Sequence, residues 1–315
     1  MTDTMNAPST LFDVSPEPQD GDNRTKKELA ALDLMFAASR RFRSSAEYMN
    51  MLLFISRFRK YSPYNCVLLY TQNPAISYVA TATQWQRRFH RVPKYDARPL
   101  IIIAPGGPVV FVYDLKDTEG PGPVPKQVLR PFSTEGRLKT GVFTNTIHNC
   151  NVHGIETREV TLGHYHGGSA IRLTQDTRKA YDQLKLDRDA HYLILTNQES
   201  TVEDRYSSLV HELGHIFCGH LGVDPKAWWH KRGNLEKTER EIEAESVSFL
   251  VCRRQGLVAS SDKYLSSYRT EGDQEVPPLS LNAILNATSY IEEMGESEWT
   301  KPQRKSPYDI PAQTK

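Results

Sequence analysis

Apolar residues between positions 202 and 217 recur at the spacing of one helix face. They are Val202, Tyr206, Leu209, Leu213, Ile216 and Phe217. Ser200 and Glu203 have the spacing of a capping box, which predicts the start of this helix. Gly219 suits its end, because glycine adopts the left-handed backbone that often closes a helix. The pattern therefore predicts an amphipathic helix between Ser200 and Gly219.

The first half of the chain predicts further helices and a hairpin. Helical periodicity covers residues 25–42, 45–60, 63–70 and 83–89. The second of these helices starts at Ser44 or Ser45, and its inward residues are Tyr48, Met51, Leu52, Ile55 and Phe58. Ser62-Pro63 caps the third, and Asn73-Pro74 ends it. Residues 99–104 and 109–115 are apolar runs of strand length around Gly106-Gly107-Pro108, which predicts a β-hairpin.

The second half predicts strands among helices. The strands cover residues 155–162, 169–173 and 191–196, and two helices cover 176–186 and 280–294. A further helix carries Arg240-Glu241-Ile242-Glu243-Ala244-Glu245. We therefore expect an α+β protein, in which a mostly helical N-terminal module with a small β-sheet is linked to a second α+β domain.

Charge and composition divide the chain into segments. Residues 1–23 carry five acids and no Lys or Arg, so we expect a disordered acidic tail. Residues 24–119 form a basic module, and its positions 24–100 contain fourteen Lys and Arg against four acids. Gly120-Pro121-Gly122-Pro123 opens a linker over residues 120–133. A domain over residues 134–297 and a loose tail over 298–315 follow.

The composition predicts a cytoplasmic protein with no membrane partner. The chain has no run of about 18 apolar residues, and its N-terminus lacks the basic-then-apolar pattern of a signal peptide. Cys66, Cys150, Cys218 and Cys252 form no CxxC pair, which fits a reducing compartment. We expect Cys218 and Cys252 to be buried small residues rather than metal ligands.

His211-Glu212-Leu213-Gly214-His215 is a HExxH motif inside the predicted helix. Residues four apart share a helix face, so the two imidazoles can bind one Zn²⁺. Glu212 lies one position round the helix, where it can take a proton from a water molecule at the metal. A chance HExxH on an ordinary helix is the alternative, and the acidic helix that follows disfavours it.

The next helix offers the third ligand, since a catalytic zinc usually has three protein ligands and one open position. Glu241 and Glu245 lie four residues apart on one face, so one can bind the metal while the other orients a ligand imidazole. Glu243 is the rival third ligand. His220 lacks the spacing of the third metzincin histidine, and we expect it to be a solvated or capping residue.

The sequence leaves the oxyanion-stabilising residue open. The turn His164-Tyr165-His166-Gly167-Gly168 contains an HxH pair that can bind a second metal or stabilise an oxyanion, although we favour exposed turn polarity. The candidates for the oxyanion role are Tyr165, His166, Tyr206 and His230. We expect Trp228 and Trp229 to form a packing anchor or a wall of the cleft.

Aromatic and cationic residues interleave in the basic module. Aromatic faces stack on bases and cations follow phosphates, which are the two needs of a single-stranded DNA site. A helical core with a solvated basic rim is the alternative, but the excess of ten positive charges favours DNA. The candidate DNA contacts are Arg57, Arg59, Lys60, Trp85, Arg87 and Arg88.

Several segments of the basic module match those of a known family. They are Tyr61-Ser62-Pro63-Tyr64-Asn65, Trp85-Gln86 with the basic turn after it, the strand at 100–104, and Val112-Tyr113-Asp114 through Thr118-Glu119-Gly120. On these segments residues 45–120 resemble the N-terminal domain of the ArdC antirestriction family, which binds single-stranded DNA and precedes a zincin-like domain. Pro93-Lys94-Tyr95-Asp96-Ala97-Arg98 departs from the Lys-Gly-Glu-Lys-Gly-like turn that is usual there.

The two metal helices resemble the gluzincin pattern, in which HExxH is followed by ExxA[D/N] on a second helix. The C-terminal half is also similar to ImmA/IrrE peptidases. This resemblance implies that Glu241 is the third ligand and that Glu245 takes the place of the usual Asp or Asn. It also implies a zincin-like metallopeptidase domain, in which an edge strand holds the substrate peptide.

We therefore expect an ArdC-like protein that binds single-stranded DNA and carries a zinc metallopeptidase acting on a protein or peptide. One alternative is an ImmA/IrrE-type regulatory metalloprotease that cleaves a transcriptional repressor. The other is a DNA-binding protein with a structural zinc, which Glu212 argues against because a structural zinc needs no general base. The basic module favours the antirestriction-type function over the regulatory protease.

Overall fold

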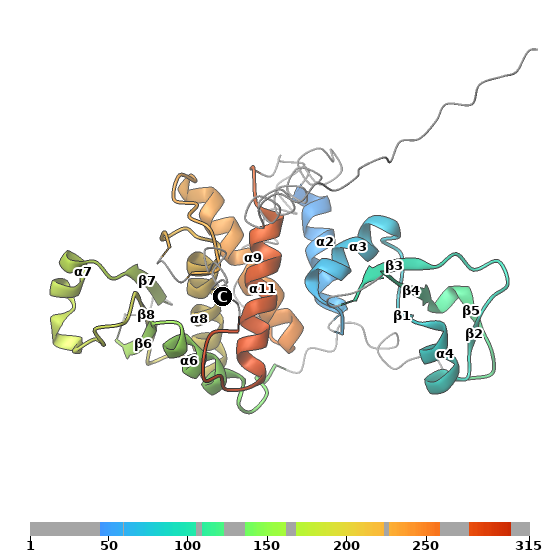
Figure 1. Ribbon diagram of the computed structural model, residues 1–315, viewed down its shortest axis with the longest axis horizontal. Coiled ribbons are helices and arrows are strands. Elements are labelled where there is room, and N and C mark those ends of the chain that lie inside the picture. Colours follow the sequence, from blue (N-terminus) through green and yellow to red (C-terminus); the bar gives the residue numbers. More distant parts are fainter. Residues whose placement is uncertain are drawn as a thin grey trace, which may run out of the picture.

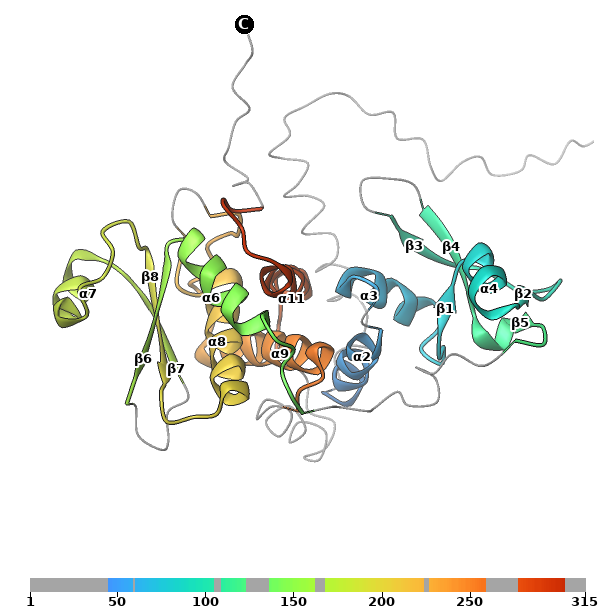
Figure 2. The ribbon, with the colours of Figure 1, turned by 90° about the horizontal axis from the view of Figure 1, so that it is seen from below.

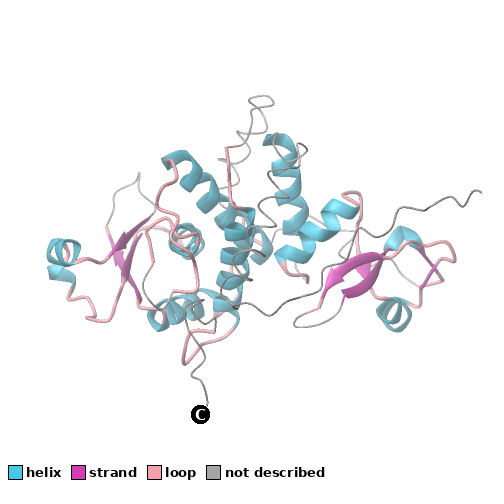
Figure 3. Cartoon of the chain, turned by 45° about the horizontal axis from the view of Figure 1, so that its top comes forward, coloured by secondary structure: helices cyan, strands magenta, loops and turns pink. Residues whose placement is uncertain are grey.

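Helices form the middle of the molecule, and a small β-sheet lies towards each end (Figures 1 and 3). The structure is a computed structural model, and it describes residues 45–58, 60–104, 109–122, 136–161, 168–223, 227–258 and 277–303. Helices and strands are mixed, as the sequence predicts. The predictions that lie outside the described residues are the acidic tail, the helix over 25–42, the Gly106-Gly107-Pro108 turn, most of the linker, the His164–Gly167 turn and residues 304–315 of the loose tail. The start of that tail is not loose, since Trp299 is buried and its backbone N–H donates to Asn149.

The N-terminal module begins with two helices, α2 (Ser45–Arg57) and α3 (Pro63–Gln72). The inward-facing residues predicted for α2 are all buried. At the start of α3, the Ser62 side chain accepts a hydrogen bond from the Asn65 amide, and the helix ends before Asn73 as predicted. The later elements are β1 (Val79–Ala80), α4 (Ala82–Phe89), β2 (Val92–Pro93), β3 (Leu100–Ile103), β4 (Val109–Asp114), a 3-10 turn (Leu115–Asp117) and β5 (Thr118–Glu119).

The predicted hairpin is the antiparallel pair β3–β4, in which Ile101 lies opposite Phe111. Strand β1 pairs with the other edge of β4, so the sheet has the order β1-β4-β3. Strands β2 and β5 form a separate antiparallel pair. Alternate residues of the hairpin face the helices, since Ile102 and Val112 are buried while Ile101 and Phe111 are exposed.

A second sheet opens the C-terminal half. Helix α6 (Val142–Val152) is followed by β6 (Ile155–Val160) and β7 (Gly168–Arg172), and β8 (Tyr192–Asn197) comes later. The three predicted strands are confirmed, and β8 lies between the other two, parallel to β6 and antiparallel to β7. All six residues of β8 are buried, as suits a central strand.

The predicted helix over 176–186 is wrong in its length. Helix α7 (Gln175–Ala180) stops at Tyr181, and a 3-10 turn (Asp182–Leu184) follows it. No residue of α7 is buried, so no tertiary packing lengthens a helix that is too short to be stable alone.

Three long helices pack between the sheets: α8 (Val202–Phe217), α9 (Lys237–Gln255) and α11 (Leu281–Glu296). The predicted N-cap of α8 is one residue early. The side chain of Thr201, not of Ser200, accepts from the Asp204 amide, because Ser200 still belongs to the turn after β8. The α11 helix begins after Ser280, as predicted. None of the helices in the described ranges has the length and apolarity to cross a bilayer.

The first two helices share one hydrophobic core with the C-terminal helices. The hydroxyl of Tyr48 in α2 lies 2.9 Å from that of Ser246 in α9. The buried guanidinium of Arg254 donates to the carbonyl oxygens of Ile55 and Phe58 at 3.1 and 3.2 Å. The small sheet of the N-terminal module contributes Val79, Ile102 and Val112 to this core and extends outward from it (Figure 2). The predicted boundary between the two modules stays a prediction, but α2 and α3 pack as part of the C-terminal helical layer.

Candidate metal centre

Helix α8 presents both histidines of the HExxH motif on one face. The rings of His211 and His215 have centroids 4.9 Å apart, and their Nε2 atoms lie 3.2 Å apart. A Cβ atom at Gly214 would lie 3.1 Å from the Cα of Ala244, so glycine lets α8 and α9 pack closely here. This packing brings Glu241 to the histidines, with its Oε2 3.6 Å from the Nε2 of each.

The three donor atoms have the spacing of a tetrahedral zinc site. Donors held about 2.0–2.1 Å from a tetrahedral zinc ion lie about 3.3–3.4 Å from one another. The separations here are 3.2 and 3.6 Å. Among the described residues this group contains three donors, which leaves a fourth position for water or substrate. The arrangement can therefore hold a zinc ion, with Glu241 as its third ligand.

Carboxylates surround His211 on both sides of its ring. The Oε1 of Glu245 lies 3.5 Å from Nδ1, the nitrogen that faces away from Glu241. Burial disfavours the charged imidazolium, but Glu241, Glu245 and Glu212 outweigh it and raise the pKa of His211. The neighbouring imidazoles of His211 and His215 hold the pKa of Glu241 far below its usual range. The negative charges of these carboxylates favour the binding of a divalent cation.

Glu212 lies between the histidine pair and the edge of the second sheet. Its carboxylate lies close to β7, where the backbone N–H of Ala170 favours the ionised form, and only 8% of the residue is exposed. A Cβ atom at Gly168 would lie 3.3 Å from the Cγ of Glu212, so glycine leaves room for this side chain. Burial raises the pKa of Glu212, although the two histidines oppose it. A carboxylate with a raised pKa is suited to general-base work.

Glu243, the rival third ligand, binds a different set of groups. Its side chain is fully buried, and its Oε2 lies 2.9 Å from the Nε2 of His220. The guanidinium of Arg232 bonds both carboxylate oxygens, at 2.5 and 2.7 Å. The Ser280 amide donates to Oε1 at 2.7 Å. Burial alone would raise the pKa of Glu243, but the hydrogen bonds from His220 and Arg232 lower it below its ordinary value.

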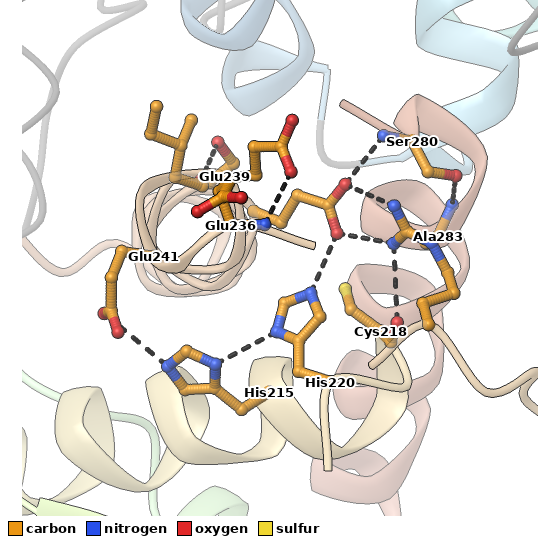
Figure 4. A network of polar contacts seen from close by, with 12 residues as sticks. His215, Cys218, His220, Glu236, Glu239, Glu241, Ser280 and Ala283 are labelled. Carbon is orange, nitrogen blue, oxygen red and sulfur yellow. Dashed lines mark hydrogen bonds and ion pairs between the residues drawn. The ribbon is translucent and has the colours of Figure 1, made fainter. Parts of the chain in front are cut away.

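Of the two roles predicted for His220, solvated or capping, the solvated one is wrong, because the residue is 4% exposed. Gly219 has a φ of 78°. The backbone N–H of Gly219 donates to the carbonyl of Ile216, and the backbone N–H of His220 donates to the carbonyl of His215. This pair of bonds is the Schellman motif, which folds the chain back against the last turn of the helix. It places the Nδ1 of His220 3.0 Å from that of His215, on the side away from Glu241 (Figure 4).

The structure argues against one predicted oxyanion candidate, Tyr206, and the other three stay predictions. Tyr206 is fully buried with its ring against Phe143, so its hydroxyl does not face a substrate. Tyr165 and His166 lie outside the described residues. His230 belongs to the loop between the metal helices, and its carbonyl closely approaches Gly219.

The predicted packing roles near the site are confirmed. Trp229 is buried, and Trp228 stacks on Phe217 with ring centroids 5.7 Å apart. The four cysteines are free and buried.

The structure contradicts one predicted DNA contact. Trp85 has no exposed surface, and its indole N–H donates to the backbone carbonyl of Tyr113 at 2.8 Å. Its ring packs edge-on against Tyr78, which in turn lies 5.6 Å below the ammonium group of Lys60. Trp85 is therefore a core residue of the N-terminal module, and its ring has no face available to stack on a base.

The predicted cationic contacts have mixed surroundings. Arg87 and Arg88 are exposed in the last turn of α4, and Arg57 is exposed at the end of α2. Lys60 is exposed as well. Arg59 lies outside the described residues. The side chains that remain open to a phosphate backbone therefore come from α2, from the turn after it and from α4.

One face of the β3–β4 hairpin exposes apolar side chains that the sequence analysis did not single out. Ile101, Ile103, Val109 and Phe111 are 41–55% exposed. They form two cross-strand pairs, Ile101 with Phe111 and Ile103 with Val109. Tyr113, two residues after Phe111 on the same face, packs against the cluster around Trp85, so α4 borders this open face. An exposed apolar group of this kind is a candidate binding surface.

Comparison of the chain with family models, with curated proteins and with solved structures found no match in any of the three sets.

Proposed function

We propose that this protein is a zinc metallopeptidase of the gluzincin type, in which His211, His215 and Glu241 hold the metal. The observation that carries the proposal is the approach of three donor atoms from two helices to within 3.2–3.6 Å of one another. A structural zinc usually has four protein ligands. The group has three within the described part of the chain, and that supports a catalytic site.

Each side chain of the site has a distinct role in the proposed reaction. A bound zinc ion would polarise the scissile carbonyl and lower the pKa of a water molecule. Glu212 takes a proton from the attacking water and returns it to the leaving amine. Glu245 orients the ring of His211 by accepting a hydrogen bond from its Nδ1. Their distance of 3.5 Å is long for a hydrogen bond, but catalytic hydrogen bonds often shorten when the substrate is bound.

Strand β7 is the proposed platform for the substrate peptide. In the described part of the sheet it pairs on one side only, with β8, so its other edge can pair with an extended chain. Because Glu212 lies against Gly168 of β7, a peptide on this edge has its backbone beside the general base. This arrangement supports cleavage of an unfolded or extended segment of a protein.

Cleavage of a peptide library tests this function. Zinc-loaded wild type is incubated with peptides derived from a whole proteome, and new termini are identified by mass spectrometry. We expect new termini from the wild type and a loss of about 10²–10⁴-fold in rate for Glu212→Gln, which keeps the metal ligands. Full activity in Glu212→Gln, or no cleavage by the zinc-loaded wild type, would show that the proposal is wrong.

We also propose that the N-terminal module binds single-stranded DNA, which would give the chain the two functions of an ArdC-like antirestriction protein. Arg87 and Arg88 are exposed on α4, the helix that borders the open face of the hairpin. Phe111, rather than the buried Trp85, offers an aromatic ring to a base. An ImmA/IrrE-type protease that cleaves a repressor is the alternative function, and it needs no affinity for single strands.

Fluorescence anisotropy with a labelled single strand and the matching duplex, over a series of salt concentrations, separates these two functions. The double charge reversal Arg87→Glu with Arg88→Glu should weaken single-strand binding at least about tenfold and flatten its salt dependence. Phe111→Ala should cost about 1–3 kcal/mol of binding free energy. The control is Lys179→Glu with Lys185→Glu, exposed residues at the opposite end of the molecule. Equal loss in the control would argue against a defined site.

A further inference from the structure

The nitrogen of His215 that faces away from the candidate metal needs a defined partner. A neutral imidazole carries one N–H, so Nε2 has a free lone pair only when the hydrogen lies on Nδ1. His211 meets this need with a carboxylate, Glu245, which can only accept. His215 instead faces another imidazole, with its Nδ1 3.0 Å from the Nδ1 of His220. An imidazole nitrogen either donates or accepts, so something must fix which nitrogen of His220 carries its hydrogen.

Glu243 fixes the hydrogen of His220. Its Oε2 lies 2.9 Å from the Nε2 of His220, and both side chains are fully buried. An ionised carboxylate accepts and never donates, so Nε2 of His220 carries the hydrogen and Nδ1 is the acceptor. That Nδ1 then accepts from the Nδ1–H of His215. Arg232 holds the carboxylate ionised and in place through bonds to both of its oxygens.

We propose that His220 is a positioning residue, which sets the tautomer and ring orientation of His215 so that Nε2 is free to bind the metal. The chain of contacts runs from Arg232 through Glu243 and His220 to His215, and it begins on a loop outside both metal helices. This inference rests on the proposed metal site. It adds a support that the HExxH motif does not contain, because His220 and Arg232 lie beyond the motif.

A second metal site formed by Cys218, His220 and Glu243 is the competing interpretation. Donor atoms of these three residues lie within 4.8 Å of one another. However, Arg232 already places its positive charge on both oxygens of Glu243, where a metal ion would have to bind. Burial also raises the pKa of the Cys218 thiol well above its ordinary value, which disfavours the thiolate that a metal requires. The group is therefore better explained as a hydrogen-bonded support.

Two amide variants of His220 separate these roles. The Oδ1 of asparagine occupies the place of the histidine Nδ1, so His220→Asn keeps an acceptor for His215. The Nε2 of glutamine occupies the place of the histidine Nε2, so His220→Gln keeps the bond to Glu243 and loses that acceptor. We expect zinc affinity within about threefold of wild type for His220→Asn and a loss of about 10–100-fold for His220→Gln.

Zinc affinity is measured by competition with a chromophoric chelator, and the visible absorption of Co²⁺-loaded protein reports the ligand geometry. Thermal unfolding of the zinc-free forms confirms that the variants fold. Equal affinities for all three proteins, or an Asn variant as weak as the Gln variant, would overturn the inference. Wild type that binds no zinc would instead contradict the proposed metal site itself.

A measurement on the unaltered chain avoids any effect of substitution on folding. Long-range ¹H–¹⁵N correlation spectra of zinc-loaded protein distinguish the two tautomers of each histidine. We expect the Nδ1–H form for His215 and the Nε2–H form for His220. The opposite pair of tautomers would contradict the proposal, whatever the affinities of the variants.

Discussion

Two faces of helix α9 carry glutamates with opposite surroundings. Glu241 is 36% exposed in its side chain and lies at equal distances from two histidines. Glu243, two residues further on, is fully buried and is held by Arg232, His220 and the Ser280 amide. A helix turns by about 200° over two residues, so neighbouring glutamates can serve different sites. The half-open face can bind a ligand, whereas the buried face stabilises the structure around it.

Replacement of the buried glutamate should have the largest effect on stability. Glu243→Ala leaves the buried His220 and the charge of Arg232 without their carboxylate, so we expect a loss of about 3–5 kcal/mol in the free energy of unfolding. Urea unfolding of the zinc-free protein measures this loss. Glu241→Ala is the matched control on the other face, where the cost should stay below about 1 kcal/mol. Similar losses in both variants would mean that the two faces do not differ as described.

Replacement of Glu245, on the more exposed face of α9, should have a smaller effect, which is confined to the affinity for zinc. Glu245→Ala removes the acceptor beside the Nδ1 of His211, so we expect zinc affinity to fall about 10–100-fold. Competition with a chelator measures this fall, and the zinc-free variant should unfold close to wild type. An unchanged zinc affinity would exclude Glu245 from the support of the site.

The smallest predicted effect is on the pH dependence of stability. It arises from Glu243, on the buried face of α9. The pKa of Glu243 is lowered despite burial, so its ionised form stabilises the fold above the ordinary carboxyl range. That contribution is lost as the pH falls through the lowered value. Zinc-free wild type and Glu243→Gln should therefore differ in unfolding free energy at pH 7, and the difference should shrink as the pH falls below the ordinary carboxyl range of about 4. A difference that stays constant down to pH 3 would contradict this assignment.

Local patterns predicted much of the metal helices. The spacing of His211 and His215 is a property of one helix, so the sequence alone places both imidazoles on one face. The same holds for Glu241 and Glu245. His220 was missed although Gly219 signals the Schellman turn, because its burial depends on Glu243 and Arg232 from later in the chain.

Long-range packing explains the errors in the N-terminal module. The aromatic and basic pattern around Trp85 does not reveal that β4 covers the indole ring, and the carbonyl that bonds it belongs to Tyr113. The hairpin strands were predicted, but the exposure of Phe111 depends on which face of the hairpin the helices cover. The contacts of Arg254 with the end of α2 likewise join segments far apart in the sequence.

The zinc content of the purified protein tests the central claim most directly. Wild type and Glu241→Ala are dialysed against buffered zinc and analysed by inductively coupled plasma mass spectrometry. We expect about one zinc ion per chain in the wild type and a large loss in Glu241→Ala, with both proteins folded. A folded wild type that retains no zinc, or a Glu241→Ala variant that retains it fully, would contradict a metal held by His211, His215 and Glu241.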